Sequence, residues 1–358
     1  MDKKTPLYDL HLELGGKMVS FGGYLLPIQY KLGIIKEHNY VRNDVGLFDV
    51  SHMGEFIVEG DDALANINHL LSNDFTSLKP NQIRYGILCN ENGGSIDDLL
   101  VYCLNANKYM LVVNAGNIEK DKTWITDNLF GQVTFRDMSE ETGLLALQGP
   151  RSIDVLSKYV NNLPDKPYRF INTSINGINC LISSTGYTGE DGYEIYTDDY
   201  NLTTLFKELL SNEVVNVEPC GLGCRDTLRM EAGLPLYNHE LDLDITPIEA
   251  GLNRFVKLDK TDFIGKKVLL SPPTRTLIGL QLIERGIGRE GSPVLIDNMK
   301  VGYVTSGTMS PTLGVSIMMA LVDINSSTNE IFDVEVRGKL IKAKKVKIPF
   351  YRKKEKNT

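Results

Sequence analysis

The sequence predicts an α+β fold with about two or three domains, because 358 residues exceed the usual size of one domain. Between residues 47 and 140, strand-like and helix-like segments follow one another in the order β-α-β-β-α with a closing strand. That order is the split βαβ pattern of ferredoxin-like units. Beyond Pro272-Pro273 the chain has only short strands separated by turns, which is typical of a small β-barrel or sandwich.

The individual elements follow from local periodicity and from turn residues. In the first 50 residues we expect helices near 5–14 and over 34–41. The ferredoxin-like segment is expected to contain strands at 56–58, 84–89, 99–103 and 109–113, with helices at 61–71 and 118–128. An αβ stretch over 143–210 and a helix and loop over 220–238 follow. The last segment is expected to contain strands at 276–282, 292–296, 302–306, 316–322, 332–336 and 340–346.

Composition excludes several classes of function. The net charge of −8 argues against nucleic acid as the main partner. No apolar run is long enough to span a bilayer, and the N-terminal residues resemble neither a signal peptide nor a transit peptide, so we expect a cytoplasmic protein without a membrane partner. The five cysteines are scattered, and Cys220 and Cys224 do not have CxxC spacing, so we expect reduced thiols and no metal site.

The C-terminal residues are strongly basic. Residues 337–356 contain ten Lys or Arg and one acid, Glu355. One interpretation is a solvated final strand and tail, since Val334, Val336, Leu340 and Val346 supply an inward-facing set. The other is a docking face for an anionic protein or ligand. RNA binding is the weaker interpretation, because few aromatic residues are interleaved for stacking.

Residues 186–194 read Gly-Tyr-Thr-Gly-Glu-Asp-Gly-Tyr-Glu and form the most informative segment of the chain. Glycine at this density permits tight turns and close approach of a ligand to the backbone. Tyr187 offers a flat face for stacking, and a carboxylate such as Glu194 accepts two parallel hydrogen bonds from a ring edge like that of guanine or a pterin. A glycine-rich hairpin explains the same residues, so both interpretations stay open.

Asp97 and Asp98 head a strand directly after the turn Asn90-Glu91-Asn92-Gly93-Gly94. Adjacent residues of a strand point to opposite faces, so only one of the two can face a pocket. A buried carboxylate without a partner is costly, which suggests a functional reason for such a residue. The alternative is that both are turn residues.

Other polar residues occur at positions where a ligand could contact them, and each also has a structural explanation. His52 and Met53 follow a buried strand, and Asn114 ends another. Alone, His52 suits a structural histidine, Met53 a core residue and Asn114 a turn. Arg225 and Arg229 share one face of a helix, as expected for anion binding or for separate carboxylate partners such as Asp226 and Glu231. The glycines at that helix start match neither GxGxxG nor a Walker A loop.

Together these segments resemble the aminomethyltransferase of the glycine cleavage system, the T-protein, nearly from end to end. The motifs that carry the resemblance are Gly46-Leu47-Phe48-Asp49-Val50-Ser51-His52-Met53-Gly54, Gly93-Gly94-Ser95-Ile96-Asp97-Asp98-Leu99, Asn114-Ala115-Gly116-Asn117, Ala146-Leu147-Gln148-Gly149-Pro150, residues 186–194, Arg225-Asp226-Thr227-Leu228-Arg229, and residues 304–314.

The resemblance implies a fold of three domains arranged as a cloverleaf around a central hole that holds folate. A first folate-binding domain would comprise residues 1–50 and 140–270, a ferredoxin-like domain residues 51–139, and a C-terminal antiparallel β-barrel residues 274–352. It also implies the reaction: the lipoyl arm of H-protein carries an aminomethyl group whose carbon passes to tetrahydrofolate, with release of ammonia and without a metal.

Individual site residues also follow from the resemblance. Asp98 matches the family's central aspartate beside the reactive nitrogens of folate, and is therefore the expected catalytic residue. Glu194 matches the acid that binds the pterin edge. The remaining positions that match the folate pocket are Met53, Tyr85, Val112, Asn114, Tyr187 and Arg225.

Two departures and two alternatives accompany the resemblance. Family members often carry proline where this chain has Gly288, and the aromatic residues of Ile348-Pro349-Phe350-Tyr351-Arg352 do not match the family's terminal folate contact clearly. One alternative is a related folate-dependent methyltransferase acting on a free methylated amine or sulfonium compound. The other is a folate-binding iron–sulfur repair protein, which a cysteine-free stretch at residues 261–266 disfavours.

Overall fold

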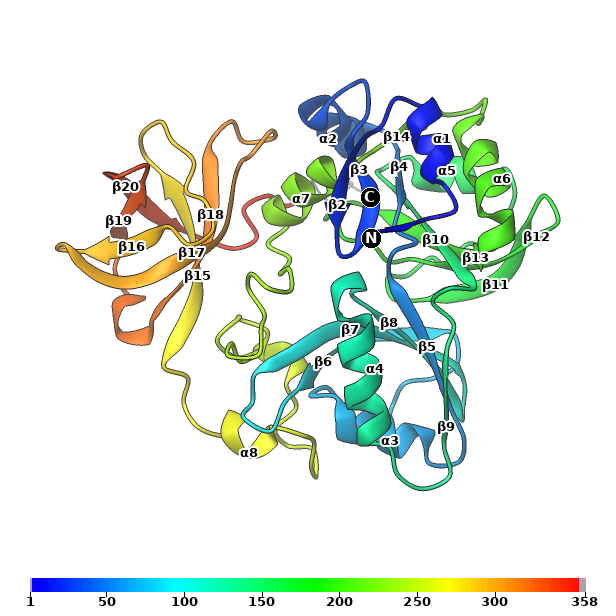
Figure 1. The fold of residues 1–358 in the computed structure, drawn as a ribbon, viewed down its shortest axis with the longest axis horizontal. Coiled ribbons are helices and arrows are strands. Elements are labelled where there is room, and N and C mark those ends of the chain that lie inside the picture. Colours follow the sequence, from blue (N-terminus) through cyan, green and yellow to red (C-terminus); the bar gives the residue numbers. More distant parts are fainter. Residues whose placement is uncertain (1, 354–358) are drawn as a thin grey trace. The chain divides into compact units, whose positions relative to one another are not determined.

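The computed structural model describes residues 2–353 and confirms the α+β class (Figure 1). These residues divide into two compact units. The first comprises the residues up to Ile67 together with Phe75–Tyr85 and Leu99–Asp226, and the second comprises Asn68–Asp74, Gly86–Asp98 and the residues from Thr227 onward. Residues 354–356 of the basic C-terminal segment lie outside the described residues.

Most of the helices are short. They are α1 (Tyr8–Glu13), α2 (Ile34–Asn43), α3 (Ala63–Leu70), α4 (Ile118–Asp127), α5 (Ser152–Leu156), α6 (Asp199–Leu210), α7 (Leu222–Glu231) and α8 (Lys266–Leu269), with 3₁₀ turns η1 (Ala115–Asn117), η2 (Asn253–Phe255) and η3 (Ile324–Ser326). The predicted helices are present, but α1 and α3 begin later than expected. α6 begins sharply because the side chain of Asp198 accepts a hydrogen bond from the Asn201 amide.

The strands of the described residues form three open sheets and one barrel. Those of the open sheets are β1 (Lys3–Lys4), β2 (Lys17–Phe21), β3 (Tyr24–Gln29), β4 (Gly46–Asp49), β5 (Gly54–Glu59), β6 (Gln82–Cys89), β7 (Ser95–Asn105), β8 (Lys108–Val113), β9 (Thr134–Asp137), β10 (Thr142–Gln148), β11 (Phe170–Ile175), β12 (Ile178–Ser183), β13 (Gly192–Asp198) and β14 (Glu218–Pro219).

A six-stranded sheet in the first unit has the order β11-β12-β13-β10-β4-β14. β10 pairs antiparallel with both β4 and β13, so that Ala146 lies between Phe48 and Glu194. Apolar residues of these strands pack against α1, α5 and α6 in one cluster, which includes Leu145, Ile195 and Phe206. β10 and β13 are buried along most of their length, as expected for central strands. A small sheet of order β1-β3-β2 completes this part.

The ferredoxin-like pattern is present in the sheet of order β6-β7-β8-β5-β9. Its four strands β7-β8-β5-β9 have the interleaved order of a ferredoxin-like unit, with β6 added at the edge. β8 pairs antiparallel with β5, and Val112 lies directly opposite Glu55. The first residue of α4, Ile118, packs closely against Gly54 of β5. A Cβ atom at Gly54 would overlap the side chains of Ile118 and Val113.

The C-terminal segment of the second unit is a closed barrel of order β15-β18-β17-β16-β19-β20. Its strands are β15 (Arg275–Leu282), β16 (Pro293–Ile296), β17 (Met299–Met309), β18 (Ser316–Asp323), β19 (Ile331–Val336) and β20 (Lys339–Val346). All six strands were expected, and the barrel excludes the sandwich. Alternate residues such as Leu280, Met318 and Val334 fill its interior.

Gly288 has a local explanation in this barrel. A Cβ atom at this position would lie 2.2 Å from Met318 Sδ, and the Gly288 carbonyl oxygen leaves no room for a side chain at Gly307. The departure from the family pattern at residue 288 is therefore matched by the packing around it. Among residues 2–353, no helix combines the length and apolar character that crossing a membrane requires.

Candidate functional site

Residues 184–191 connect β12 to β13, so the glycine-rich segment is indeed a hairpin connection. Its glycines are required by the contacts that they make. A Cβ atom at Gly186 or Gly192 would lie 2.0 Å and 2.5 Å from side-chain atoms of Gln148, and Gly189 has a φ of +78°. Close approach to Gln148 and a left-handed turn therefore account for the glycine content.

Two polar side chains from other elements hold this connection. Gln148, at the end of β10, donates to the Thr185 carbonyl at 3.1 Å and accepts from the Thr188 hydroxyl at 2.9 Å. Arg42 of α2 donates to the Thr188 carbonyl at 2.8 Å and forms a buried ion pair with Glu190 at 2.9 Å. The loop is therefore fixed by buried hydrogen bonds even though part of it is exposed.

Glu194 lies on β13 at one end of a chain of buried hydroxyl groups. Thr185 Oγ1 donates to Glu194 Oε2 at 2.5 Å. Ser183 Oγ lies 2.6 Å from Thr185 Oγ1, the Tyr102 hydroxyl 3.1 Å from Ser183 Oγ, and the Tyr196 hydroxyl 2.8 Å from that of Tyr102. An ionised carboxylate only accepts, so each hydroxyl in turn donates toward Glu194. The four hydroxyl groups therefore donate their hydrogen bonds in one direction, toward Glu194.

Electrostatic effects on Glu194 oppose one another. Burial raises the pKa of Glu194, while the Thr185 hydrogen bond and the Arg225 guanidinium lower it. Burial likewise lowers the pKa of Arg225, and Glu194 raises it. The guanidinium carbon of Arg225 lies 4.9 Å from the ring centre of Tyr187, a cation–π distance. The structure thus brings three of the sequence-predicted residues, Glu194, Arg225 and Tyr187, into one electrostatic cluster.

Met53, Val112 and Asn114 come from two neighbouring strands. Met53 is half-buried in the turn that precedes β5, where its amide donates to the Val50 carbonyl at 3.1 Å. Val112 is buried on β8. Asn114 is half-buried at the end of β8, and its carbonyl accepts from the Asn117 amide at 2.9 Å. The turn interpretation of Asn114 is therefore correct, and its position at a strand end leaves the binding prediction untested.

His52 is buried near Arg225. Its ring meets those of Phe21 and Tyr24 edge to face, with centroids 5.8 Å and 6.3 Å apart. Burial and the nearby Arg225 lower the pKa of His52 to about 4, so the imidazole is neutral near pH 7. Within the described residues, its Nδ1 atom is buried without a hydrogen-bond partner. A structural histidine was the simpler interpretation from sequence, but an unsatisfied ring nitrogen calls for a further explanation.

Asp97 and Asp98 lie near the start of β7, which begins at Ser95. Asp97 is completely buried, whereas Asp98 is half-buried. Strand alternation puts Asp98 on the same face of β7 as Leu100, which lies opposite Val112 of β8. Tyr85 is half-buried on β6. The two aspartates therefore point to opposite faces, as expected.

Sequence reasoning missed residues that support the site from a distance. Gln148 was part of a recognised motif, but its role in shaping the 184–191 connection follows only from the fold. Thr185 and Ser183 precede the glycine-rich motif and read as ordinary strand and turn residues. Glu55 follows Met53 by two positions and had no signal beyond its charge.

A buried group that includes two cysteines lies elsewhere in the first unit. Ligand atoms of Glu37, Cys220 and Cys224 lie within 4.8 Å of one another. The Glu37 carboxylate accepts hydrogen bonds from the backbone amides of Tyr30 at 2.6 Å and Gly221 at 2.9 Å. It therefore provides a partner for the buried amide just before α7. Burial raises the pKa of Cys220 well above its ordinary value, which favours the thiol over the metal-binding thiolate.

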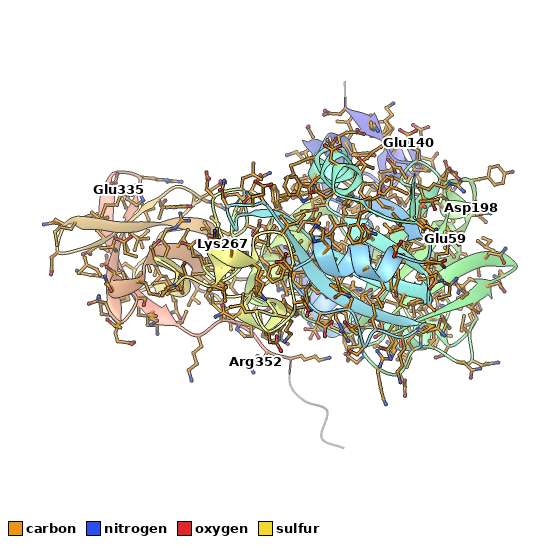
Figure 2. All side chains as sticks on the ribbon, turned by 90° about the horizontal axis from the view of Figure 1, so that it is seen from below. Glu59, Glu140, Asp198, Lys267, Glu335 and Arg352 are labelled. Carbon is orange, nitrogen blue, oxygen red and sulfur yellow. The ribbon has the colours of Figure 1, made fainter. Side chains whose placement is uncertain are left out.

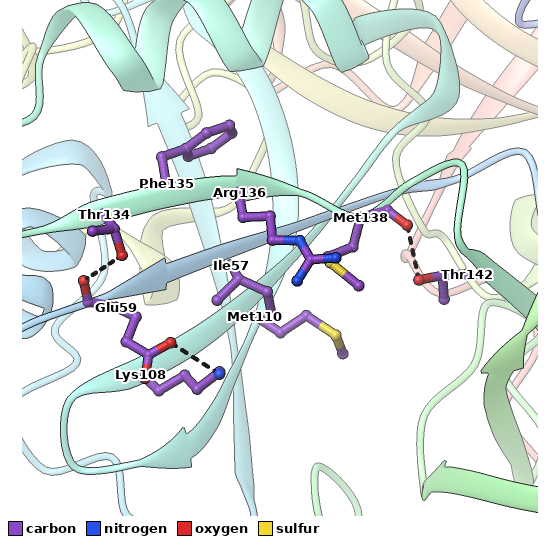
Figure 3. Close-up of a pocket in the computed structure, with 9 residues that line it drawn as sticks. All are labelled: Ile57, Glu59, Lys108, Met110, Thr134, Phe135, Arg136, Met138 and Thr142. Carbon is purple, nitrogen blue, oxygen red and sulfur yellow. Dashed lines mark hydrogen bonds and ion pairs between the residues drawn. The ribbon is translucent and has the colours of Figure 1, made fainter.

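An open groove of about 480 Å³ lies on the face of the ferredoxin-like sheet formed by β5, β8 and β9 (Figure 3). Ile57, Met110 and Met138 supply its apolar walls. At one end Glu59, also labelled in Figure 2, pairs with Lys108 at 2.9 Å. None of the lining residues is among the predicted site residues, so this groove is a separate feature of the same sheet.

Known proteins resemble this chain along almost its whole length. The GCVT N-terminal domain family matches residues 7–260, and the glycine cleavage T-protein C-terminal barrel domain matches residues 275–352. Aminomethyltransferases of Moorella thermoacetica and Bacillus subtilis are each 47% identical to it, over 363 and 369 residues. The alignments cover 99% of this chain in both cases, and 99% and 100% of the relatives.

A solved structure agrees with these matches. The crystal structure of the glycine cleavage system aminomethyltransferase T from Bartonella henselae superimposes with a TM-score of 0.92 at 34% identity, covering 98% of each chain. Both the sequence and the fold therefore agree over the full length. The chain belongs to the aminomethyltransferase family, the T-proteins of the glycine cleavage system.

Proposed function

We propose that this chain transfers a one-carbon unit from the aminomethyl-lipoyl arm of H-protein to tetrahydrofolate, releasing ammonia. The observation that carries the proposal is the cluster of Glu194, Arg225 and Tyr187 in a chain that belongs to the aminomethyltransferase family. A carboxylate beside a guanidinium, a hydroxyl donor and an aromatic face suits a flat ring with N–H donors on one edge.

The reaction needs two C–N bonds to form and two bonds to break. The N5 and N10 nitrogens of tetrahydrofolate each bond to the donated carbon and each lose a proton. The C–S bond to the lipoyl arm and the C–N bond to the amino group break. One proton goes to the thiolate that leaves, the other accompanies the ammonia, and no net oxidation occurs.

In this proposal Asp98 is the catalytic carboxylate, placed beside N5 and N10. A carboxylate there orients the nucleophilic amine and moves protons as ammonia leaves, which is worth roughly 10²–10⁴-fold in rate. Glu194 accepts from the ring N–H groups, and Arg225 lowers the pKa of Glu194 against the effect of burial. Met53, Tyr85, Val112, Asn114 and Tyr187 complete the pocket.

Domain limits and surroundings belong to the same proposal. Residues 1–50 with 140–270 form the first folate-binding domain, 51–139 the ferredoxin-like domain and 274–352 the barrel. The protein works in the cytoplasm with lipoylated H-protein as its partner. Exposed Arg285 and Arg289, with the basic residues from Arg337 onward, suit an acidic carrier.

The test is tetrahydrofolate-dependent release of ammonia from aminomethyl-lipoyl H-protein, with unlipoylated H-protein as the control. We expect ammonia and 5,10-methylenetetrahydrofolate in equal amounts, and none with the control. Methyl transfer from a free methylated amine or sulfonium compound, without release of ammonia from H-protein, would support the related methyltransferase instead.

A further inference from the structure

Glu55 is a buried acid that neither the fold nor the proposed pocket uses. It lies on β5, which pairs with β8 on one side and β9 on the other. Its amide donates to Ser139 Oγ at 3.1 Å and its carbonyl accepts from the Met138 amide at 2.8 Å. Both backbone groups of Glu55 are therefore held by the segment that follows β9, and the side chain cannot easily turn away to solvent.

The Glu55 carboxyl group has no hydrogen-bond partner among the described residues. Only 1% of this residue is exposed, and both carboxyl oxygens are buried. Leaving such a group unsatisfied is costly, and more so if it is ionised. A fold with no use for this acid would be more stable with an apolar side chain of the same size.

The surroundings of Glu55 favour its neutral form. Burial, the Asp137 carboxylate and Glu194 all raise its pKa well above the ordinary value. Asp137 is itself paired with Lys122 at 3.1 Å, so its own charge is compensated. Among the described residues, Tyr24 of β3 and Tyr196 of β13 also interact with Glu55, and they carry no charge near pH 7.

Position ties this acid to the proposed pocket. Glu55 lies directly opposite Val112, so both side chains are on one face of the sheet, and it follows Met53 by two residues. The nearby Glu194 is one of the groups that raise the pKa of Glu55. Arg225, beside Glu194, also has a buried nitrogen, Nη1, without a partner among the described residues. Glu55 and Arg225, which both interact electrostatically with Glu194, thus each have a buried polar atom without a partner among the described residues.

We propose that Glu55 is a further ligand-binding residue of this site, whose carboxyl O–H donates a hydrogen bond to an acceptor atom of the bound folate ring. The inference rests on the proposed function and deepens it. The ring carries a carbonyl oxygen as well as N–H donors, so the two acids have different roles in binding it. Glu194 accepts from the ring N–H groups, and Glu55 donates to an acceptor. Discrimination follows, because a ring that lacks the acceptor leaves this buried acid unpaired.

The test compares two variants of similar shape, Glu55→Met and Glu55→Gln, in the full-length protein. Tetrahydrofolate binding is measured by calorimetry, and unfolding of the ligand-free protein by a thermal melt. Glu59→Gln is the matched control, because Glu59 lies on the same strand and the same face but pairs with Lys108 at the surface.

We expect Glu55→Met to keep or raise the melting temperature and to weaken tetrahydrofolate binding about tenfold or more, since a buried hydrogen bond to the ligand is lost. Glu55→Gln retains a donor, and its Kd should stay within about threefold of the unaltered protein. If Glu55→Met binds as well as the control, or if both variants lose binding equally, Glu55 is no hydrogen-bond donor to the ligand. An unaltered protein that binds no tetrahydrofolate would instead contradict the proposed function itself.

Discussion

Replacing Thr185 by valine tests whether its hydrogen bond lowers the pKa of Glu194 and so favours the ionised form that is expected to bind folate. Thr185→Val preserves the shape of the side chain and removes the hydroxyl that donates to Glu194 Oε2 at 2.5 Å. Ser183 then loses its contact with Thr185 Oγ1 but keeps the Tyr102 hydroxyl and the Glu194 carbonyl nearby. The main effect of the substitution therefore falls on the Glu194 carboxylate.

The magnitude follows from the burial of both groups. A hydrogen bond to a charged group contributes about 1.5–3 kcal/mol, and one pKa unit corresponds to about 1.4 kcal/mol. Losing the Thr185 bond should therefore raise the pKa of Glu194 by about one to two units, beyond the increase that burial already causes. Glu194 must be ionised to accept two ring N–H groups, so folate affinity is present above its pKa and lost below it.

The measurement is the Kd of tetrahydrofolate by calorimetry between about pH 5 and pH 8. We expect the midpoint at which affinity falls to shift upward by about one to two pH units in Thr185→Val. Thr197→Val is the control, because Thr197 lies on β13 with Glu194 and donates to a neutral acceptor, the Asn179 carbonyl, at 2.9 Å. Superimposable pH profiles for Thr185→Val and the unaltered protein would refute this account of Glu194.

Three further predictions concern catalysis, stability and docking. Asp98→Asn should lower turnover at least about tenfold and Asp97→Asn less, measured as ammonia release per folded enzyme; greater loss from Asp97→Asn would reverse the assignment. Burial alone would raise the pKa of Asp49, but hydrogen bonds led by that from His11 lower it, so its stabilisation is present above the unfolded-state pKa and lost as pH falls through the folded one. Urea unfolding should therefore show a cost of about 3 kcal/mol or more for Asp49→Asn at pH 7, which begins to shrink only below about pH 4 and disappears once the pH is below the folded-state pKa of Asp49. The KM for lipoylated H-protein should rise with salt and with Arg289→Ala; a KM that neither changes places the docking surface elsewhere.

Local sequence patterns predicted most of the fold, because the elements concerned depend on nearby residues. Each barrel strand alternates inward and outward residues between clear turn signals, so all six were predicted within a few residues. The starts of α1 and α3 were less accurate; at α1 no side chain caps the N-terminus, so the sequence carries no clear start signal there. Closure of the barrel depends on pairing of β15 with β20, which no local pattern reveals.

The candidate site was predicted only in part. Glu194, Arg225 and Tyr187 belong to recognisable motifs, and the fold brings them together. Tyr102 and Ser183, by contrast, are 81 positions apart and meet only because two sheets come together in the first unit. A missing hydrogen-bond partner, as at Glu55, is also invisible in a sequence, because it is a property of everything that surrounds the side chain.

The contacts of Gln148 have a consequence for how the glycine-rich motif is inherited and transplanted. Its shape is encoded partly outside itself, in Gln148 on β10 and Arg42 on α2. Grafting residues 184–194 onto an unrelated hairpin would therefore transfer the amino-acid sequence but not its conformation. Conversely, a relative could vary the loop sequence widely and keep its path, provided that the amide and guanidinium anchors change in step with it.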